Sequence, residues 1–220
     1  MIKNTACMRR ICSLVVAMFL TASALLHAQD RDFITWTSAG FKYKVKQAFT
    51  LSGNLEWRTK DNLDKTDRWG VDVGGAYSVL PFLKVGTGYE AHYRYRGEAG
   101  WKFRHRYYAD GTLSTRVWGL KVSLRERFQH TFGDGDGELH WRSRIKLSYG
   151  IPGCKIEPYA SVEMYNGLNR GERFDVQRMR YRGGVVIPMS PDWEADIFYC
   201  RQWESKARKD IIGVACTYSF

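Results

Sequence analysis

Hydrophobic and polar side chains alternate along the chain in segments of about 10–14 residues, which is the length of a tilted strand that crosses a bilayer. In the segment 49–60, Leu55 and Trp57 lie on one face, and Glu56 and Arg58 lie on the other. A period of two predicts strands, because a helix would repeat its apolar face every three to four residues. The pattern therefore predicts an all-β chain.

The alternation predicts eleven strands, over 33–46, 49–60, 68–79, 83–96, 102–115, 119–132, 140–151, 155–166, 176–188, 193–204 and 210–220. Strands of soluble β-sandwiches are usually about 5–6 residues long, roughly half the length of these segments. We therefore predict a transmembrane antiparallel β-barrel of about 10–12 strands rather than a soluble sandwich. Single-chain bacterial barrels normally have an even number of strands, so we expect that residues 29–36 add a short strand or that one segment is wrong.

The last segment indicates which side of the sheet faces lipid. Ile212, Val214, Cys216, Tyr218 and Phe220 share one face, while small or polar residues take most of the other. A wall with lipid on one side and water on the other has this pattern. A closing strand with a terminal phenylalanine resembles the assembly signal of bacterial outer-membrane barrels. It predicts the cell outer membrane as the location, and outer-membrane lipid, lipopolysaccharide and the barrel assembly machinery as partners.

The N-terminus has the composition of a secretory signal peptide. A basic start at Lys3, Arg9 and Arg10 precedes a short apolar run, and small residues follow. The run is too short to cross a bilayer as a helix, which needs about 20 residues. We therefore predict a signal peptide over 1–28 and a single barrel domain over 29–220. Export argues against nucleic acid as a partner.

The connections between the segments alternate in character. Tight turns are expected at 46–47, 80–82, 152–153 and 190–192, and longer polar loops at 61–67, 97–101, 133–139, 167–175 and 205–209. Outer-membrane barrels have short turns at the periplasmic rim and longer loops outside. The alternation therefore predicts which rim is which.

The face opposite the apolar one is strongly basic, and the chain has a formal net charge of +11. Charged side chains are costly in lipid, so we expect them in the lumen. The predicted lumen charge network contains Arg58, Arg94, Arg104, Arg106, Arg125, Arg127, Arg142, Arg144, Arg180, Arg182, Glu56, Asp72, Glu90 and Glu163. Paired across strands, these groups would brace a structural barrel. Left partly unpaired, they would line a narrow pore that attracts anions.

Two other functions stay open from the residues alone. An outer-membrane enzyme acting on lipid or lipid A would need a Ser–His pair on the lipid-facing wall, where alternation places His105, His130 and Ser143. No motif orients these residues, so no catalytic residue is assigned. A surface module could instead bind an acidic glycan or another ligand with the polar loops. Neither a cofactor nor a metal is expected, since the carboxylates of 133–138 lack the spacing of a calcium loop.

A few residues test the alternation directly. Glu126 falls on the lipid-facing side, which a bulge or a position at the rim would explain. Cys200 is expected to point inward and Cys216 outward, so we predict no disulfide between them. Glycines inside the strands are expected to ease curvature or to make room for large lumen side chains, because no helix follows them that could hold a phosphate.

Five short stretches occur in a recognisable order along the chain. They are Asp-Phe-Ile-Thr-Trp-Thr at 32–37, Glu-Trp-Arg at 56–58, Arg-His-Arg-Tyr-Tyr at 104–108, Ser-Leu-Arg-Glu-Arg-Phe-Gln at 123–129 and Glu-Pro-Tyr at 157–159. Together they resemble the uncharacterised family named domain of unknown function 2490, from Gram-negative bacteria. Its members look like secreted outer-membrane barrels without an assigned activity. The resemblance implies a location and a fold, and it supplies no catalytic residues.

Overall fold

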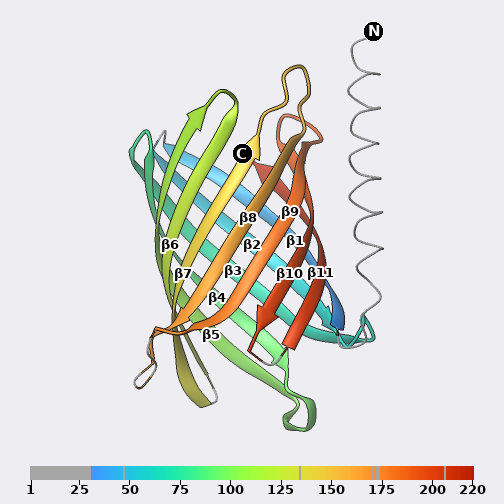
Figure 1. Cartoon of the computed structure of the whole chain (residues 1–220). Coiled ribbons are helices and arrows are strands. Elements are labelled where there is room, and N and C mark those ends of the chain that lie inside the picture. The colour runs from blue at the N-terminus through green and yellow to red at the C-terminus, as the bar shows by residue number, and fades with distance from the viewer. Residues whose placement is uncertain (1–30, 47, 134, 170, 172–173, 206) are drawn as a thin grey trace.

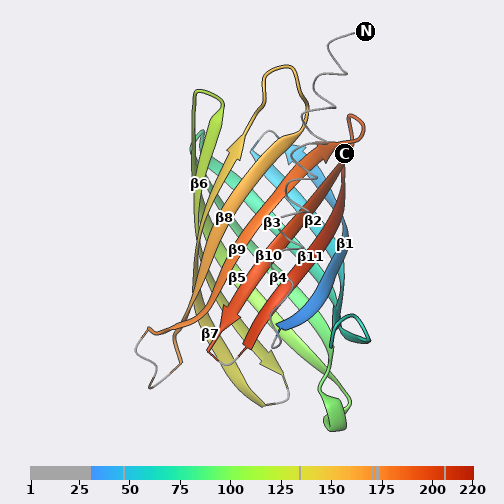
Figure 2. The ribbon, with the colours of Figure 1, turned by 45° about the vertical axis from the view of Figure 1, so that its right-hand side comes forward.

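The computed structural model describes residues 31–46, 48–133, 135–169, 171, 174–205 and 207–220. Within them the chain forms a closed barrel of eleven tilted strands, shown from two directions in Figures 1 and 2. The elements are β1 (Arg31–Lys46), β2 (Phe49–Lys60), β3 (Lys65–Leu80), β4 (Leu83–Tyr95), the short 3-10 helix η1 (Gly97–Ala99), β5 (Trp101–Val117), β6 (Leu120–Gly133), β7 (Gly135–Tyr149), β8 (Glu157–Gly167), β9 (Val176–Pro188), β10 (Trp193–Glu204) and β11 (Ala207–Ser219). The predicted signal peptide over 1–28 lies outside the described residues. No helix within them is long and apolar enough to span a membrane.

The barrel closes through a parallel pair of strands. β1 and β11 run in the same direction, in a register from Arg31 opposite Arg208 to Lys42 opposite Ser219. All other neighbours are consecutive in sequence and antiparallel. The eleven predicted segments are thus confirmed, and the expected even number is wrong, because residues 31–36 continue into the rest of β1. An odd number of up-and-down strands closes only if the first and last point the same way.

The predicted difference between the two rims is wrong in part. The expected loop 133–139 is largely strand, since β6 and β7 stay paired up to Gly133 and Gly135. The expected tight turn at 152–153 lies inside a longer connection, 150–156, at the rim that also holds the C-terminus (Figure 1). Pairing continues wherever a neighbouring strand offers partners, and turn composition alone does not reveal how far.

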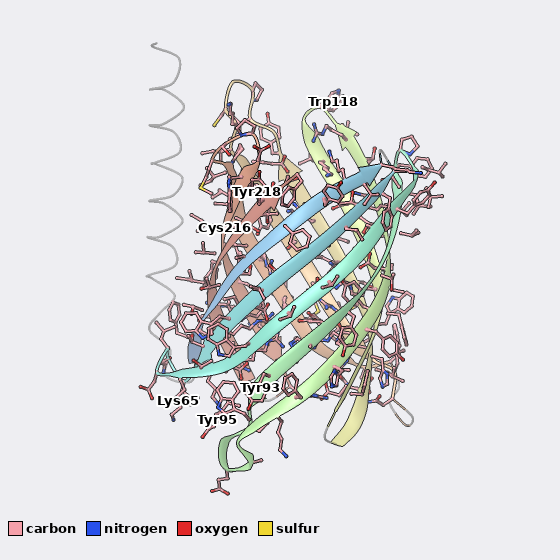
Figure 3. All side chains as sticks on the ribbon, turned by 180° about the vertical axis from the view of Figure 1, so that it is seen from behind. Lys65, Tyr93, Tyr95, Trp118, Cys216 and Tyr218 are labelled. Atoms are coloured by element: carbon pink, nitrogen blue, oxygen red, sulfur yellow. The ribbon has the colours of Figure 1, made fainter. Side chains whose placement is uncertain are left out.

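Apolar side chains cover the outer wall, as the alternation predicts. Leu55, for example, is 61% exposed. Figure 3 shows aromatic side chains at both ends of this wall, with Tyr93 and Tyr95 near one end and Tyr218 near the other. The rings of Tyr218 and Trp193 pack with their centroids 5.0 Å apart. Aromatic residues at both rims are typical of a barrel that crosses a bilayer.

Glu126 does lie on the outer wall, in the middle of β6. Its register with β7 shows no bulge nearby, so the predicted bulge or rim position is wrong. One carboxylate oxygen, Oε2, accepts hydrogen bonds from Trp141 Nε1 and Ser143 Oγ, each at 2.6 Å. Two donors on the neighbouring strand thus satisfy this outward carboxylate. The strand therefore keeps its regular alternation of inward and outward side chains at Glu126. Cys200 and Cys216 are free, as predicted.

One wall of the interior is apolar rather than charged. Its buried cluster consists of Ile34, Trp36, Tyr159, Phe198, Cys200 and Ile211. Gly213 faces this cluster from β11, and the ring of Phe198 occupies the place that a β-carbon on Gly213 would take. Gly184 on β9 makes similar room, because its β-carbon would lie 2.7 Å from that of Phe198. These glycines make space for large inward side chains, in line with the prediction.

Gly213→Ala is therefore expected to destabilise the barrel by about 1–3 kcal/mol, because the new methyl group would overlap the ring of Phe198. Gly183→Ala is the matched control, since a β-carbon there would meet only the backbone oxygen of Tyr159, at 4.0 Å. Urea unfolding in detergent micelles, followed by tryptophan fluorescence, compares the two variants. Equal stability of the two variants would show that the barrel can hold the ring of Phe198 without the space at Gly213.

Candidate functional site

Two cavities occupy the interior of the barrel. We call them the end cavity, of about 260 Å³, and the inner cavity, of about 230 Å³. The end cavity extends to Arg96 beside η1, and the inner cavity lies further toward the opposite rim. Trp36, Arg58, Arg142 and Arg180 line both cavities. These four residues, which we call the boundary layer, therefore lie where the two spaces meet.

The end cavity carries a large excess of positive charge. Its ten basic residues are Arg58, Arg68, Arg94, Arg96, Arg104, Arg106, Arg142, Arg178, Arg180 and Lys209, and its four acidic residues are Asp67, Glu90, Glu138 and Glu204. Arg96 lies in the connection beyond β4, where partial burial and then repulsion from Arg94 and Arg104 lower the pKa of its guanidinium. Burial is the larger cause, and the like charges nearby act in the same direction.

The inner cavity is smaller and also has more basic than acidic residues. Its six arginines are Arg58, Arg125, Arg142, Arg144, Arg180 and Arg182, and its three carboxylates belong to Glu56, Glu163 and Asp196. In the part of the chain that the structure describes, neither Arg144 nor Arg182 has a carboxylate within ion-pair distance. The inner cavity therefore holds more guanidinium groups than its carboxylates pair with.

Glu163 on β8 is the central acceptor of the inner cavity. It receives Arg125 Nη2 at 2.6 Å from β6 and Arg142 Nη2 at 2.9 Å from β7, and Arg180 Nη1 from β9 lies 3.7 Å away. The hydroxyl of Tyr165 also donates to Glu163, at 3.2 Å. A carboxylate that is mostly buried and serves several donors ties four neighbouring strands together.

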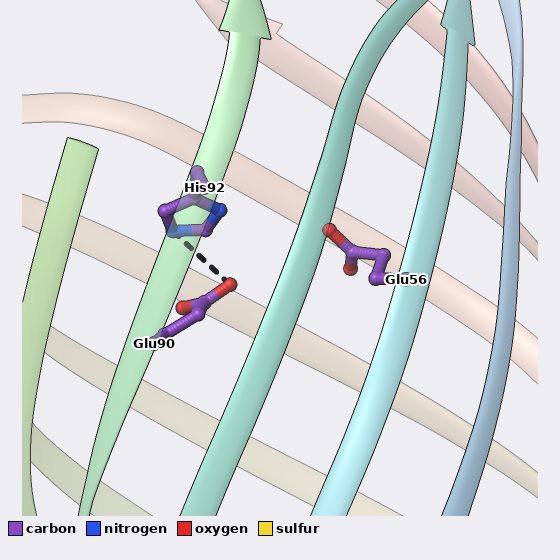
Figure 4. A group of neighbouring side chains, drawn as sticks. All are labelled: Glu56, Glu90 and His92. Carbon is purple, nitrogen blue, oxygen red and sulfur yellow. Dashed lines mark ion pairs between the residues drawn. The ribbon is translucent and has the colours of Figure 1, made fainter. Parts of the chain in front are cut away.

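A second acidic group lies on the opposite wall. Figure 4 shows Glu90 and His92 on β4 and Glu56 on β2, all within the barrel. Glu56 binds Arg58 at 2.5 Å and Arg68 at 2.9 Å. Glu90 binds Arg106 of β5 at 2.8 Å. His92 Nε2 lies 3.2 Å from Glu90, although neither ring nitrogen makes a directed hydrogen bond to another described residue.

The ligand atoms of Glu56, Glu90 and His92 lie within 4.8 Å of one another, which is close enough to hold a metal ion. Both carboxylates, however, already bind arginines, including Arg68 and Arg106. A divalent cation would have to displace these guanidiniums or lie against them at a high electrostatic cost. The donor set fits an ion-pair network better than a metal centre.

Aromatic rings hold the arginines of the boundary layer in place. The Arg58 guanidinium lies 3.7 Å from the centre of the Trp36 ring, and that of Arg180 lies 4.9 Å from it. The guanidiniums of Arg142 and Arg180 lie 4.4 Å and 4.8 Å from the centre of the Tyr165 ring. Stacking leaves the guanidinium edges for hydrogen bonds. Arg142 uses both Nη atoms on Gln129 and Glu163, whereas the Nε atoms of Arg58 and Arg142 have no partner within the described residues and are available to an anion.

The other predicted network residues form smaller pairs along the lumen. Arg94 binds Asp67 at 3.1 Å, Arg104 binds Glu138 at 2.9 Å, and Arg127 binds Asp110 at 2.5 Å. Among the described residues, Asp72 accepts a single long hydrogen bond of 3.4 Å, from the hydroxyl of Tyr108. Most of the predicted residues line the two cavities, and Arg127 and Asp72 contact side chains on neighbouring strands, so they form several small groups.

Several residues of these groups were not predicted, among them Asp67, Glu138 and Tyr108. Trp36 and Tyr165 stack on arginines, Gln129 accepts from Arg142 at 2.8 Å, and Gln202 accepts from Arg180 at 2.6 Å. Gln129 and Tyr165 each follow a predicted lumen residue by two positions, so alternation could have found both. It could not show which guanidinium each would meet, because that depends on register.

His105, His130 and Ser143, which we considered for a lipid-hydrolysing site, each form a hydrogen bond with a different residue. His105 Nδ1 bonds the hydroxyl of Tyr89, and His130 Nδ1 bonds that of Tyr107 at 2.9 Å. Ser143 donates to Glu126 instead. The Ser–His contact that would activate a serine nucleophile is therefore not formed by these three residues.

Several solved structures share the fold. The KdgM porin has 14% sequence identity and a TM-score of 0.50, over 82% of this chain and 89% of the porin. The NanC porin has 14% identity and a TM-score of 0.50, over 77% and 86%. LpxR from Salmonella typhimurium has 10% identity and a TM-score of 0.52, over 78% and 83%. At such identities the likeness shows a common barrel architecture and nothing finer.

A search of curated proteins finds no match to this chain. The resemblance of its short motifs to an uncharacterised family is nevertheless confirmed over most of the barrel. The family described as "Protein of unknown function (DUF2490)" matches residues 33–212, from β1 into β11, and this chain belongs to it.

Proposed function

We propose that this protein is an outer-membrane β-barrel whose lumen acts as a narrow, anion-selective pore. The excess of positive charge in the end cavity, with ten basic and four acidic residues, carries the proposal. Glu56 and Glu163, outside this lining, neutralise part of the charge through Arg58, Arg68 and Arg142. Side chains fixed on strands cannot move away from one another, so the remaining excess attracts anions from solution. A pore lined by one sign of charge concentrates the opposite ion and passes it selectively.

The outer wall supports the membrane part of the proposal. Apolar side chains such as Leu55 and Val73 are more than half exposed, which is costly in water and favourable in lipid. Aromatic pairs lie toward both rims. Tyr93 packs against Trp101 at one rim, and Tyr218 packs against Trp193 at the other. We infer that lipid covers this wall and that lipopolysaccharide and the assembly machinery are its partners.

One structural neighbour supports an acidic ligand. A KdgM porin structure with 13% identity and a TM-score of 0.50 was obtained "in complex with disordered oligogalacturonate", a chain of carboxylate-bearing sugars. The same architecture can therefore accommodate a polyanion. In this chain, a basic end cavity would offer such a ligand, or smaller anions, a favourable entry.

A purely structural barrel is the competing proposal, and ion pairs favour it only in part. Pairs such as Arg127–Asp110 brace neighbouring strands. The basic residues of both cavities nevertheless outnumber the acidic ones. A lumen built for bracing alone would gain from balanced charge, because every unmatched guanidinium raises the electrostatic energy of the others. The imbalance favours a pore.

Single-channel recording in planar bilayers tests the pore directly. Under a KCl gradient we expect a small, stable conductance whose reversal potential lies toward that of chloride. Arg96→Glu, at the entrance of the end cavity, should weaken the preference for chloride. Lys65→Glu makes the same change of charge at an exposed site outside both cavities and should leave it intact. A silent or cation-selective barrel would contradict the proposal.

A further inference from the structure

The inner cavity has hydrogen-bond donors without acceptors. Trp36 Nε1 and the Nε atoms of Arg58, Arg125 and Arg142 are buried and have no partner within the described residues. All four side chains line this cavity. They come from β1, β2, β6 and β7, strands on opposite sides of the closed barrel. The donors therefore approach the cavity from different directions rather than forming a patch on one wall.

Burying such groups without acceptors is costly. Trp36 is 7% exposed and Arg142 is 9% exposed, so bulk water does not satisfy them. An unpaired buried donor costs as much as a lost hydrogen bond, and more when it is charged. The unmatched groups in the described part of the cavity are all donors, so the partner that fits them is rich in acceptors.

Charge decides what kind of acceptor the cavity would hold. A buried water could accept from some of these donors, but it brings no charge. The cavity has six arginines and three carboxylates, and Arg144 and Arg182 lack ion-pair partners among the described residues. An anion meets the need for acceptors and the need for negative charge together, and arginine binds oxyanions in paired hydrogen bonds.

The number of oxygens decides the class of anion. A carboxylate offers two oxygens in a plane, whereas a phosphate group offers oxygens in tetrahedral directions and carries up to two negative charges near neutral pH. Donors that converge from opposite walls match the tetrahedral group better. A space of about 230 Å³ can hold phosphate alone or with part of a small organic group attached.

We propose that the inner cavity is a binding site for a phosphate group, either free or carried by a small solute, held by Arg125, Arg142, Arg144 and Arg182 beneath Trp36. The proposal deepens the anion-selective pore by naming the group that binds inside it. Bound there, phosphate would pair with guanidiniums that Glu163 alone does not neutralise. It would also lie directly behind the boundary layer and so control the passage of other anions.

Binding to the full barrel in detergent micelles tests the site without a membrane. Inorganic phosphate, glucose 6-phosphate and glucuronate are titrated by calorimetry at constant chloride. We expect phosphate or the phosphate ester to bind, and glucuronate to bind at least about tenfold more weakly. Tighter binding of the ester than of inorganic phosphate would identify a phosphorylated solute as the ligand, and the reverse order would identify free phosphate.

Matched variants locate the binding site. Arg144→Gln and Arg182→Gln should each weaken phosphate binding about tenfold or more, because each removes one charged donor from the cavity. Neither has an ion-pair partner in the described structure that the change would leave buried alone. Arg116→Gln removes the same charge from an exposed position on β5 outside both cavities and should bind like the parent protein.

The outcomes separate this site from the pore itself. Anion-selective conductance without phosphate binding would overturn the site and leave the proposed function standing. Phosphate binding without conductance would support the site and overturn the proposed pore. Tighter binding of glucuronate than of both phosphate compounds would overturn the assignment to phosphate. Equal binding by Arg144→Gln, Arg182→Gln and Arg116→Gln would overturn the location.

Discussion

Replacing Glu163 with alanine is expected to destabilise the barrel by about 3–5 kcal/mol, because removing one partner of a buried ion pair leaves the other charge uncompensated. In this protein one carboxylate serves Arg125 at 2.6 Å, Arg142 at 2.9 Å and Arg180 at 3.7 Å. The side chain of Glu163 is only 8% exposed, so water cannot replace it. The variant would hold three arginines close together in a cavity that already has too few carboxylates.

Glu194→Ala is the control for this effect. It removes the same kind of group from the Lys42–Glu194 pair, whose distance is 2.6 Å and whose side chains are 49% and 38% exposed. Exposed pairs contribute about 0–1 kcal/mol, so the stability should change little. Urea unfolding of both variants in micelles measures the difference. Similar losses for both would mean that Glu163 is not the centre of the network.

The Glu163→Ala variant also links stability to the proposed ligand. Its inner cavity would carry one more unmatched positive charge than that of the parent protein. A ligand that binds only the folded state stabilises it in proportion to its occupancy, so phosphate should restore part of the lost stability. Chloride at the same ionic strength should restore less, since it cannot offer several oxygens. Equal effects of the two salts would indicate general screening instead.

Trp36→Ala is expected to join the two cavities and to raise the single-channel conductance clearly above that of the parent protein. Trp36 lines both cavities and supports the guanidiniums of Arg58 and Arg180. Removing its ring would open the boundary layer, while Arg58 stays bound to Glu56 and Arg180 to Gln202. The ring is also part of the buried apolar cluster, so the same change should cost about 3–5 kcal/mol of stability.

Trp118→Ala separates the pore effect from the loss of any tryptophan. Trp118 lies in the turn between β5 and β6 and is 97% exposed. Its removal should alter stability by less than about 0.5 kcal/mol and leave the conductance unchanged. Bilayer recordings of both variants, made on barrels first shown to be folded, provide the comparison. An unchanged conductance in Trp36→Ala would place the constriction elsewhere in the lumen.

The lumen residues could be found from the sequence because one strong physical preference governs them. A charged group in lipid is so costly that alternation alone assigns Arg125, Arg142 and Glu163 to the interior. Trp36 was not assigned a role in the lumen, because an aromatic side chain is stable both against lipid and in the interior of a barrel. Glu126 shows the limit of the rule, since its carboxylate lies outside and is satisfied by donors on the next strand.

By itself, the order of apolar and polar residues determined that this chain forms long strands, which face of each strand is apolar, and that the interior is basic, because these properties depend on a repeat of two along one strand. Only the tertiary structure decided how β1 meets β11, that a single glutamate serves three arginines, and that Trp36 lines both cavities. Those features depend on register between strands and on contacts across the lumen, which join residues far apart in the chain and leave no local signal.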